Sequence, residues 1–482
     1  MTALTLILAA GVFTGAPCGL AEPLPPALES RVECGWVTVP RDSARPSSPT
    51  IRLWTARIRA SGTARRDPIV YLNGGPGIAT VDAILPVFAE SKTWASLAAD
   101  RDIILFDQRG SGRSDDALCP ELIGQLEALE AQGLSPVEED ERERSMFVAC
   151  RASLDAAGVD LDAYSTATTV DDMEAVRTAY AIERWNLVSV SYGSLIALHA
   201  LRARPGNIRS AILNSPYPPN SASWAEQVTA TASAYQAIDR ACTAQPSCAA
   251  RFGPLIPKLE ATLARLEQEP VRDGERQITG RLFAGALWPL AVRSSTVHFV
   301  PLAIERAHAG DENVIRGLVR TFAGGGSFGA FAPAQAMAIS CHEGGRTREW
   351  YARARALYPS LTSKAPDDSW DRLCAAFRPG FAEPAFFAPV ASDVPVLLYA
   401  GSLDPATPTI DAYMAVRFLN QATIAEVQGA AHAPMGLDDC TRGIATAFLD
   451  RPESTPDTSC LAERPPLDFA ETGLAEILDP AE

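Results

Sequence analysis

The 482-residue chain lacks several patterns that would assign it to a narrow class. It carries 42 Lys and Arg against 58 Asp and Glu, a formal charge of −16, which argues against nucleic acid as a partner because phosphate binding requires clustered basic side chains. Past the extreme N-terminus, no apolar run is long enough to span a bilayer. No Cys-x-x-Cys pair occurs, which argues against a zinc ribbon or a thioredoxin-like site.

The N-terminus has the apolar character of an export signal. Residues 1–21 include an apolar stretch at 4–13, although no Lys or Arg precedes it. Ten cysteines, an even number, indicate disulfides in an oxidising compartment, so we expect a periplasmic or extracellular protein. Cleavage after Gly11 or after Ala21 is compatible with the sequence, and the earlier position is favoured because it keeps Cys18. Sequence proximity suggests, without fixing, the pairs Cys18–Cys34, Cys119–Cys150, Cys242–Cys248, Cys341–Cys374 and Cys440–Cys460.

Short apolar runs followed by turns predict the strands of a sheet. Residues 35–40 and 51–58 flank a Pro/Ser-rich turn, as in a hairpin. The remaining runs fit strands buried on both faces of a parallel sheet, with a helix between the second and third of them at 169–181. These runs are residues 69–72, 102–106, 185–190, 208–213, 394–399 and 422–427.

A serine lies at the apex of a predicted turn between a strand and a helix. Residues 189–193 read Ser-Val-Ser-Tyr-Gly, with Ser191 between the apolar run 185–190 and the helical stretch 195–202. This arrangement exposes a nucleophilic hydroxyl above the sheet and requires small flanking residues, because the strand and the helix pass closely. Ser189 replaces the usual glycine and is small enough to fit. The pattern alone is weak, since similar strings occur in ordinary turns.

An acid and a base follow the serine in the order that this arrangement requires. Asp404 follows the strand 394–399, and His432 follows the strand 422–427. A serine hydroxyl becomes nucleophilic when a neutral imidazole accepts its proton, and a carboxylate fixes the imidazole tautomer. Of the five histidines, only His432 follows a sheet strand on a glycine-led loop. Asp393 precedes its strand and therefore lies at the wrong end of the sheet.

The strand–helix alternation stops near residue 216 and resumes near 390. The segment between is rich in Ala, Arg and Glu at helical spacing, which predicts a cap on one α/β domain. The predicted fold class is α/β, namely an α/β-hydrolase fold with a mostly parallel sheet flanked by helices. The helical cap is inserted after the strand that follows the nucleophile helix. The expected divisions are a signal at residues 1–21, the first part of the core at 22–216, the cap at 217–389 and the second part of the core at 390–482. The tail after residue 460 is expected to be poorly ordered.

A glycine-rich loop supplies the donors that acyl transfer needs. Residues 73–77 read Asn-Gly-Gly-Pro-Gly, and a glycine turn lets backbone N–H groups approach a tetrahedral oxyanion. The expected donors are the N–H groups of Tyr192 and Gly75, and the alternative is a plain tight turn. Residues 110–114, Gly-Ser-Gly-Arg-Ser, lack the lysine and the following helix of a phosphate-binding loop.

Three segments together resemble the prolyl aminopeptidase and tripeptidyl aminopeptidase family of α/β-hydrolases. They are Asn-Gly-Gly-Pro-Gly at 73–77, Asp-Gln-Arg-Gly-Ser-Gly-Arg-Ser at 107–114 and Val-Ser-Tyr-Gly at 190–193. The chain is most similar to the secreted bacterial branch, whose members carry a C-terminal segment like the one from residue 381 onward. Prolyl aminopeptidases usually have His where Asn73 stands, and the secreted branch often has Asn, so the resemblance does not imply strict proline specificity.

The resemblance also implies how the substrate is held. Family members cleave peptides from a free N-terminus and bind the terminal amine with cap carboxylates. Glu343 resembles the acidic residue after the family's Ile-x-Cys motif and is expected to pair with the substrate ammonium; the alternative is a solvated cap carboxylate, and Glu226 or Asp239 are weaker candidates. Asp107 and Arg113 are expected to hold their loop rather than to touch substrate.

The expected function is that of an exported serine hydrolase. It is an aminopeptidase that releases short N-terminal units, proline-type or tripeptidyl, from peptides with a free N-terminus through an acyl-enzyme. No metal or organic cofactor is implied. Two alternatives share these residues: a carboxylesterase or lipase-like hydrolase with the same triad, and a catalytically inactive hydrolase fold that serves as a binding protein.

Overall fold

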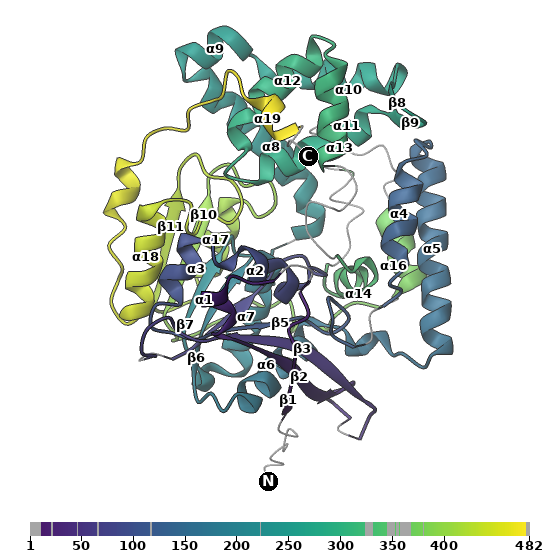
Figure 1. Ribbon diagram of the computed structural model, residues 1–482. Helices are drawn as coiled ribbons and strands as arrows, with labels where there is room; N and C mark the ends of the chain where they lie inside the picture. The colour runs from purple at the N-terminus through teal and green to yellow at the C-terminus, as the bar shows by residue number, and fades with distance from the viewer. Residues whose placement is uncertain are drawn as a thin grey trace.

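The computed structural model describes residues 11–20, 23–45, 47–64, 67–115, 118–221, 223–322, 331–344, 368–378 and 380–478, with 352 and 356. For residue 136 and residues 223–228 it describes the backbone only. A nine-stranded sheet forms the core, in the order β1-β2-β3-β5-β4-β6-β7-β10-β11 (Figure 1). Its strands are β1 (Val12–Ala16), β2 (Val32–Pro40), β3 (Thr50–Ile58), β4 (Ile69–Leu72), β5 (Ile103–Phe106), β6 (Trp185–Val190), β7 (Ile208–Asn214), β10 (Val396–Gly401) and β11 (Ala422–Val427).

The sheet is antiparallel at one edge and parallel elsewhere. The pairs β1–β2, β2–β3 and β3–β5 are antiparallel, whereas every neighbouring pair from β5 to β11 is parallel. The strands expected from the sequence are thus confirmed, each to within a few residues. In the parallel part, the carboxyl ends of the strands share one edge, which is where the polar turns after β4, β6, β10 and β11 meet.

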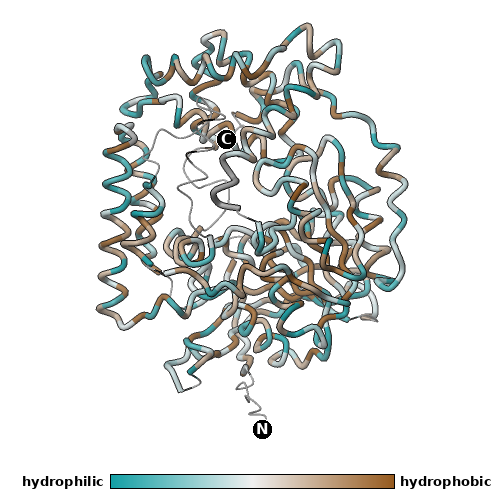
Figure 2. Tube along the Cα trace, turned by 180° about the vertical axis from the view of Figure 1, so that it is seen from behind, coloured by the Kyte–Doolittle hydropathy of each residue, from teal (hydrophilic) through white to brown (hydrophobic). Residues whose placement is uncertain are grey.

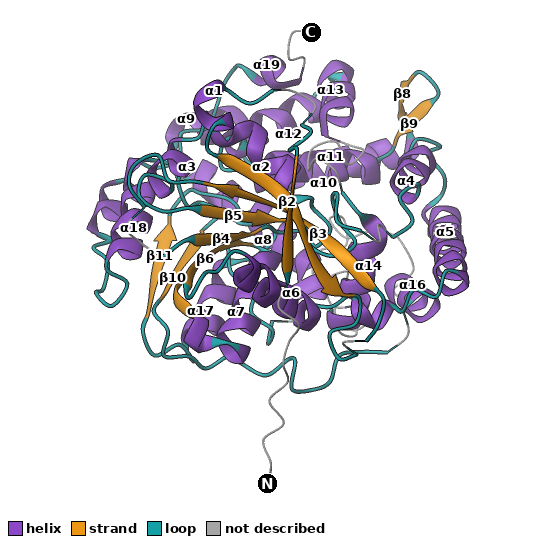
Figure 3. Cartoon of the chain, turned by 60° about the horizontal axis from the view of Figure 1, so that its bottom comes forward, coloured by secondary structure: helices purple, strands orange, loops and turns teal. Residues whose placement is uncertain are grey.

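Helices cover both faces of the sheet, because successive strand residues point to opposite sides (Figure 3). Leu187, Leu213 and Leu398 pack with α6 (Thr166–Ala179), α7 (Tyr192–Ala203) and α17 (Thr409–Val416). Their neighbours Val188, Ile212 and Leu397 pack with the helices of the other face. Those helices are α1 (Pro26–Glu29), α2 (Thr80–Phe88), α3 (Lys92–Leu97) and α18 (Asp439–Asp450). Hydrophobic and hydrophilic residues accordingly alternate along much of the chain trace (Figure 2).

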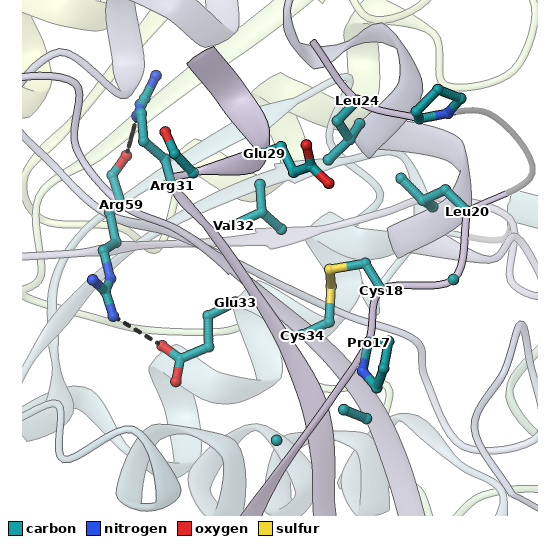
Figure 4. Close-up of a pocket in the computed structure, with 15 residues that line it drawn as sticks. Pro17, Cys18, Leu20, Leu24, Glu29, Arg31, Val32, Glu33, Cys34 and Arg59 are labelled. Atoms are coloured by element: carbon teal, nitrogen blue, oxygen red, sulfur yellow. Dashed lines mark hydrogen bonds and ion pairs between the residues drawn. A yellow bond between two sulfur atoms is a disulfide. The ribbon is translucent and has the colours of Figure 1, made fainter. Parts of the chain in front are cut away.

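Part of the segment expected to be an export signal belongs to the sheet. Strand β1 pairs with β2 over five residues, from Val12 opposite Thr38 to Ala16 opposite Cys34. Just beyond β1, Cys18 forms a disulfide with Cys34 (Figure 4). An open cavity of about 680 Å³ lies beside this disulfide. Removal of a signal that extends to residue 21 would therefore take away both β1 and the partner of Cys34.

All five disulfides expected from sequence proximity are formed. They join all ten cysteines, with S–S distances of 1.97–2.08 Å. Each closes a short loop of the chain, and such links stabilise a fold mainly by restricting the unfolded chain. Among the described residues, no helix combines the length and the apolar character needed to cross a bilayer.

The larger lobe of the cap is helical, as expected, and stands over the carboxyl edge of the sheet (Figure 1). Its helices enclose one apolar core. They are α8 (Ser223–Thr243), α9 (Pro246–Phe252), α10 (Leu255–Gln268), α11 (Gly280–Val292), η3 (Val297–Phe299), α12 (Val300–His308) and α13 (Glu312–Phe322), with a hairpin of β8 (Val271–Asp273) and β9 (Arg276–Ile278). The C-terminal tail, expected to be poorly ordered, returns to this lobe after η5 (Ser459–Glu463), and α19 (Leu474–Leu478) packs on α13. Phe469 and Leu474 supply the apolar contacts.

A smaller lobe departs from the expected domain divisions. Helices α4 (Leu122–Glu130) and α5 (Pro136–Ala156), expected to belong to the core, pack instead with α14 (Pro333–Glu343) and α16 (Ser369–Phe377) around a separate apolar cluster. The disulfides Cys119–Cys150 and Cys341–Cys374 lie in this lobe. The sequence boundary at 216 misses α4 and α5 because both lie between β5 and β6 in the chain, where a helix that covers the sheet is expected.

Candidate active site

Ser191 occupies a strained turn between β6 and α7. Its backbone has φ 54° and ψ −126°, a conformation that non-glycine residues adopt at functional turns where the surroundings enforce it. Close packing provides that enforcement: a Cβ on Gly193 would lie 2.0 Å from the carbonyl oxygen of Leu72. Ser189, in place of the usual glycine, is fully buried, and its hydroxyl donates to the carbonyl of Ile212 at 2.8 Å. The small-residue requirement at both flanks is therefore met.

Asp404 lies in the turn after β10 and is 4% exposed. Its Oδ1 accepts the backbone N–H groups of Ala406 and Thr407 at 2.8 and 3.0 Å. Its Oδ2 accepts the hydroxyls of Ser215 and Thr407 at 2.8 and 2.9 Å. Burial would raise the pKa of Asp404, but His432 and these donors outweigh burial and hold that pKa below its usual value. The carboxylate is thus kept ionised inside the protein.

His432 follows β11 and faces this carboxylate. Its Nδ1 lies 2.7 Å from Oδ2 of Asp404. A carboxylate only accepts hydrogen bonds, so Nδ1 carries the hydrogen and Nε2 is left as a proton acceptor. The histidine loop is tied to the end of cap helix α11: the His432 N–H donates to the carbonyl of Val292 at 2.9 Å, and the Ala431 N–H donates to the hydroxyl of Ser294 at 2.9 Å.

Two residues at the end of β7 connect these groups, Asn214 as its last residue and Ser215 directly after it, and sequence reasoning missed both. The carbonyl of Asn214 accepts the N–H of Ser191 at 3.0 Å, and its side-chain oxygen accepts the N–H of Met435 at 3.0 Å. The hydroxyl of Ser215 donates to Asp404 and accepts the N–H of Ala433 at 2.9 Å. Ser215 is fully buried and has φ 59°. The available signal was its position, since polar residues directly after a buried parallel strand lie at the edge that carries the site.

The glycine-rich loop after β4 lies against Ser191. A Cβ on Gly74 would be 3.0 Å from the Cβ and 3.6 Å from the hydroxyl oxygen of Ser191. Gly75 has φ +111°, a conformation that favours glycine. Asn73 is buried, and its side-chain oxygen accepts the N–H of Gly74 at 2.9 Å. The loop and Tyr192, the first residue of α7, therefore flank the serine from two sides, as the expected oxyanion donors must.

Asp107 and Arg113 hold their loop, as expected. Asp107 is fully buried and accepts the N–H groups of Thr80 and Val81 at the start of α2, at 2.7 and 2.8 Å, and that of Arg113 at 2.9 Å. Burial raises its pKa to about 6 despite these donors. The Arg113 guanidinium pairs with Asp82 at 2.8 Å. These contacts tie the turn at 107–114 to the first turn of α2.

Glu343 lies at the end of α14 and is 6% exposed. Both of its carboxylate oxygens accept hydrogen bonds from Thr166, the first residue of α6. Burial raises the pKa of Glu343 to about 7, while Thr166 and the charge of Arg378 act in the opposite direction. Of the weaker candidates, Asp239 accepts the N–H of Leu255 within the cap, at 2.7 Å, and the side chain of Glu226 lies outside the described residues. Within the described chain, no cluster of three or more His, Cys, Asp or Glu side chains has a metal-binding arrangement.

Comparison with known proteins places two parts of the chain in families. Residues 67–238 match the alpha/beta hydrolase fold family, and residues 365–460 match the TAP-like protein family. The tripeptidyl aminopeptidase of Streptomyces coelicolor is 29% identical over 192 residues, which is 39% of this chain and 36% of the relative. The serine protease Hip1 of Mycobacterium tuberculosis is 28% identical over 194 residues, again 39% of this chain and 36% of the relative. The alignments thus span about a third of the length of these relatives.

Among solved structures, the proline iminopeptidase of Mycobacterium smegmatis aligns with 84% of this chain and 96% of its own, at 16% identity and a TM-score of 0.37. The family matches cover the loop at 73–77, the serine turn and the segment that carries Asp404 and His432. They agree with the parallel sheet and the flanking helices described above. The chain therefore has the α/β-hydrolase fold and carries a TAP-like C-terminal segment.

Proposed function

We propose that this chain is an exported serine aminopeptidase that releases short N-terminal units, proline-type or tripeptidyl, from peptides. The observation that carries the proposal is the contact of 2.7 Å between His432 and the buried carboxylate of Asp404, which Ser215 holds beside the strained turn of Ser191. The relatives named tripeptidyl aminopeptidase and serine protease support peptides as the substrate class. The TAP-like match over residues 365–460 extends this support to the C-terminal part.

In the proposed mechanism, the hydroxyl oxygen of Ser191 attacks the carbonyl carbon of the scissile peptide bond, and Nε2 of His432 accepts its proton. Asp404 stabilises the imidazolium that forms. The carbonyl oxygen becomes an oxyanion that accepts the N–H groups of Tyr192 and Gly75. His432 then protonates the departing amine as the C–N bond breaks, which leaves an acyl ester on Ser191. A water molecule, deprotonated by His432, cleaves this ester and restores the serine.

Export through an oxidising compartment is the second part of the proposal. Five disulfides support it, because such bonds persist outside the reducing cytosol. We propose cleavage after Gly11. Cleavage after Ala21 would remove β1 from the sheet and leave Cys34 without its partner.

A substrate comparison tests the proposal. The wild-type protein is assayed with tripeptidyl and prolyl arylamides that have a free amine, with the N-acetylated forms of the same compounds, and with short acyl p-nitrophenyl esters. The proposal predicts turnover of a free-amine arylamide, with a large loss on acetylation. Ester turnover without arylamide turnover would indicate a carboxylesterase instead. Labelling by a fluorophosphonate that disappears in Ser191→Ala would exclude an inactive binding protein, and absence of labelling in the folded wild type would favour one.

A further inference from the structure

A chain of hydrogen bonds runs beneath the serine turn from the cap to Tyr192. Oε1 of Glu343 accepts the N–H of Thr166 at 2.6 Å, and Oε2 accepts the hydroxyl of Thr166 at 2.5 Å. The same hydroxyl oxygen lies 2.8 Å from the phenol oxygen of Tyr192. Glu343, Thr166 and Tyr192 are 6%, 0% and 2% exposed, so no bulk water competes for these bonds.

The donors in this chain have a defined order. Above the pKa of about 7 that burial gives Glu343, its carboxylate is ionised and only accepts, so the Thr166 hydroxyl donates its single hydrogen to Glu343. The lone pair that remains on the Thr166 oxygen then accepts the phenol hydrogen of Tyr192. Each buried group is satisfied only when its neighbours stay in place, because an unpaired buried polar group is costly. The carboxylate of Glu343 thereby fixes the orientation of the Tyr192 ring.

The same helix that ends at Glu343 also touches the glycine-rich loop at its other end. The N–H of Ala332, just before α14, donates to the carbonyl of Gly77 at 2.9 Å. Phe331 forms an isolated antiparallel bridge with Ile78. A Cβ on Gly77 would lie 2.9 Å from the carbonyl oxygen of Ala332, so the two segments are in close contact. Helix α14 and the residues before it therefore contact the glycine-rich loop directly and are linked to Tyr192 through Thr166.

We propose that Glu343 is a positioning residue, which acts through Thr166 on Tyr192 and holds the Tyr192 N–H at the spacing from the Gly75 N–H that an oxyanion requires. This inference rests on the proposed function, since it presumes that acyl transfer occurs at Ser191. Preorganised donors lower the barrier because they need no rearrangement when negative charge develops. A small displacement of such a donor is therefore expressed in the chemical step, not in substrate binding.

This role differs from the amine contact expected from the sequence. Both oxygens of Glu343 already accept hydrogen bonds from Thr166, and the side chain is almost fully enclosed. The charged group that faces it, Arg378, donates to the carbonyls of Tyr164 and Ala338 and holds the base of α14. All of these hydrogen bonds join groups of the protein to one another, so they hold Glu343 and Arg378 in place.

Three variants break the chain at successive bonds: Glu343→Gln, Thr166→Val and Tyr192→Phe. The amide that Glu343→Gln introduces donates where the carboxylate accepted, so the hydrogens in the chain must reverse, whereas valine and phenylalanine remove one hydroxyl with little change of shape. Thr166→Ser keeps the hydroxyl and serves as the conservative variant. Tyr180→Phe is the matched control, because it removes a phenol that also lies 2.8 Å from a threonine hydroxyl, that of Thr55, remote from Ser191.

The readouts are kcat and KM for p-nitrophenyl acetate, which has no amine, and for a free-amine tripeptidyl arylamide, with the rate of fluorophosphonate labelling. The three chain-breaking variants are expected to lower kcat for both substrates, and the labelling rate, by about tenfold or more, with KM within about twofold. Thr166→Ser and Tyr180→Phe are expected to stay near the wild type. Thermal melting identifies any variant that fails to fold; Tyr192→Phe, which removes only the last bond, then decides the result.

Two outcomes would overturn the inference. If Glu343→Gln raises only KM for the arylamide and leaves ester kcat unchanged, Glu343 binds the substrate amine, and the proposed function stands without the positioning role. If Tyr192→Phe and Thr166→Val match Tyr180→Phe, the hydrogen-bond chain has no role in the reaction. A wild type that hydrolyses the ester but no arylamide would contradict the proposed function alone, because the ester series still measures positioning. A wild type that reacts with neither substrate nor the phosphonate would contradict both.

Discussion

The hydroxyl of Ser215 donates to Oδ2 of Asp404 at 2.8 Å and accepts the N–H of Ala433 at 2.9 Å, so one buried side chain joins the acid to the loop of the base. Ser215 follows β7, the strand between the serine turn and the strand that carries Asp404. The same Oδ2 of Asp404 also accepts a hydrogen bond from Nδ1 of His432. The position of the imidazole relative to the serine therefore depends on a residue that takes no part in proton transfer.

We predict that Ser215→Ala lowers kcat by about tenfold, because it leaves Asp404 one donor short and frees the loop at Ala433. KM should change little. The control is Ser210→Ala on the same strand, where a fully buried hydroxyl donates to Asn186 at 2.7 Å, away from the site. Equal kcat values in the two variants would show that Ser215 has only a structural role.

Asp404→Asn is expected to lower kcat by about ten-thousandfold, because the amide would favour the wrong tautomer of His432. The structure should remain intact, since Asn retains an oxygen for the N–H groups of Ala406 and Thr407. Asp393→Asn is the control: Asp393 is exposed at the other end of β10 and accepts the side-chain amide of Asn420 at 2.7 Å. Steady-state kinetics with an active ester or arylamide would measure both, and a loss below about tenfold for Asp404→Asn would contradict its assignment as the acid.

Gly193→Ala should destabilise the fold by about 4 kcal/mol, because its Cβ would lie 2.0 Å from the Leu72 carbonyl in the centre of the sheet. The strand and helix would have to separate, which would also displace Ser191. Gly206→Ala, where a Cβ would meet nothing within 4 Å, should change the free energy of unfolding by no more than about 0.5 kcal/mol. Denaturant unfolding of both variants tests this, and similar midpoints would contradict it.

Acid should weaken the fold through His199. Burial, helped by the charge of Arg202, lowers the pKa of this nucleophile-helix residue to about 3. The folded state thus binds fewer protons than the unfolded state between about pH 6.5 and 3, so the free energy of unfolding falls as pH falls through this range. Relative to His199→Gln, the wild type should lose about 2 kcal/mol between pH 7 and pH 5. Any pH-independent cost of the substitution cancels in this comparison, and His308→Gln, at an exposed position, should follow the wild type.

The N-terminus of the exported protein should be Val12. N-terminal sequencing after secretion by a bacterial host would show it, and peptide mapping without reduction would recover a fragment that joins Cys18 to Cys34. Cys34→Ser should lower stability by about 3 kcal/mol, the size expected for a loop of this length. A mature chain that begins at residue 22 would contradict the proposed cleavage and would require a sheet without β1.

Local patterns were enough to predict the pairing of Asp404 with His432 and the turn of Ser191, but not the residues that support them. Ser191, Asp404 and His432 each follow a strand of the parallel part of the sheet, and the carboxyl ends of parallel strands lie at one edge, so strand order alone places all three there. The same rule could have identified Ser215 as a residue of the site. A serine after a strand, however, carries little information until its partner is known. The partners of Glu343 could not be predicted from the sequence. Thr166 is 177 residues away, and the contact between Thr166 and Glu343 depends on how the smaller lobe meets the core.

The hydrogen bonds between the histidine loop and the end of α11 couple the position of the proposed base to that of the cap. Because the His432 amide is bonded to Val292, any movement that lifts α11 from the sheet also withdraws the base from Ser191. Helix α19 braces the same lobe from the far end of the chain. We expect the protein to be inactive when the cap has opened, because His432 would then be withdrawn from Ser191. A large folded protein that displaces the cap would therefore not be cleaved. Hydrogen exchange at the His432 amide would measure how often its hydrogen bond to Val292 opens.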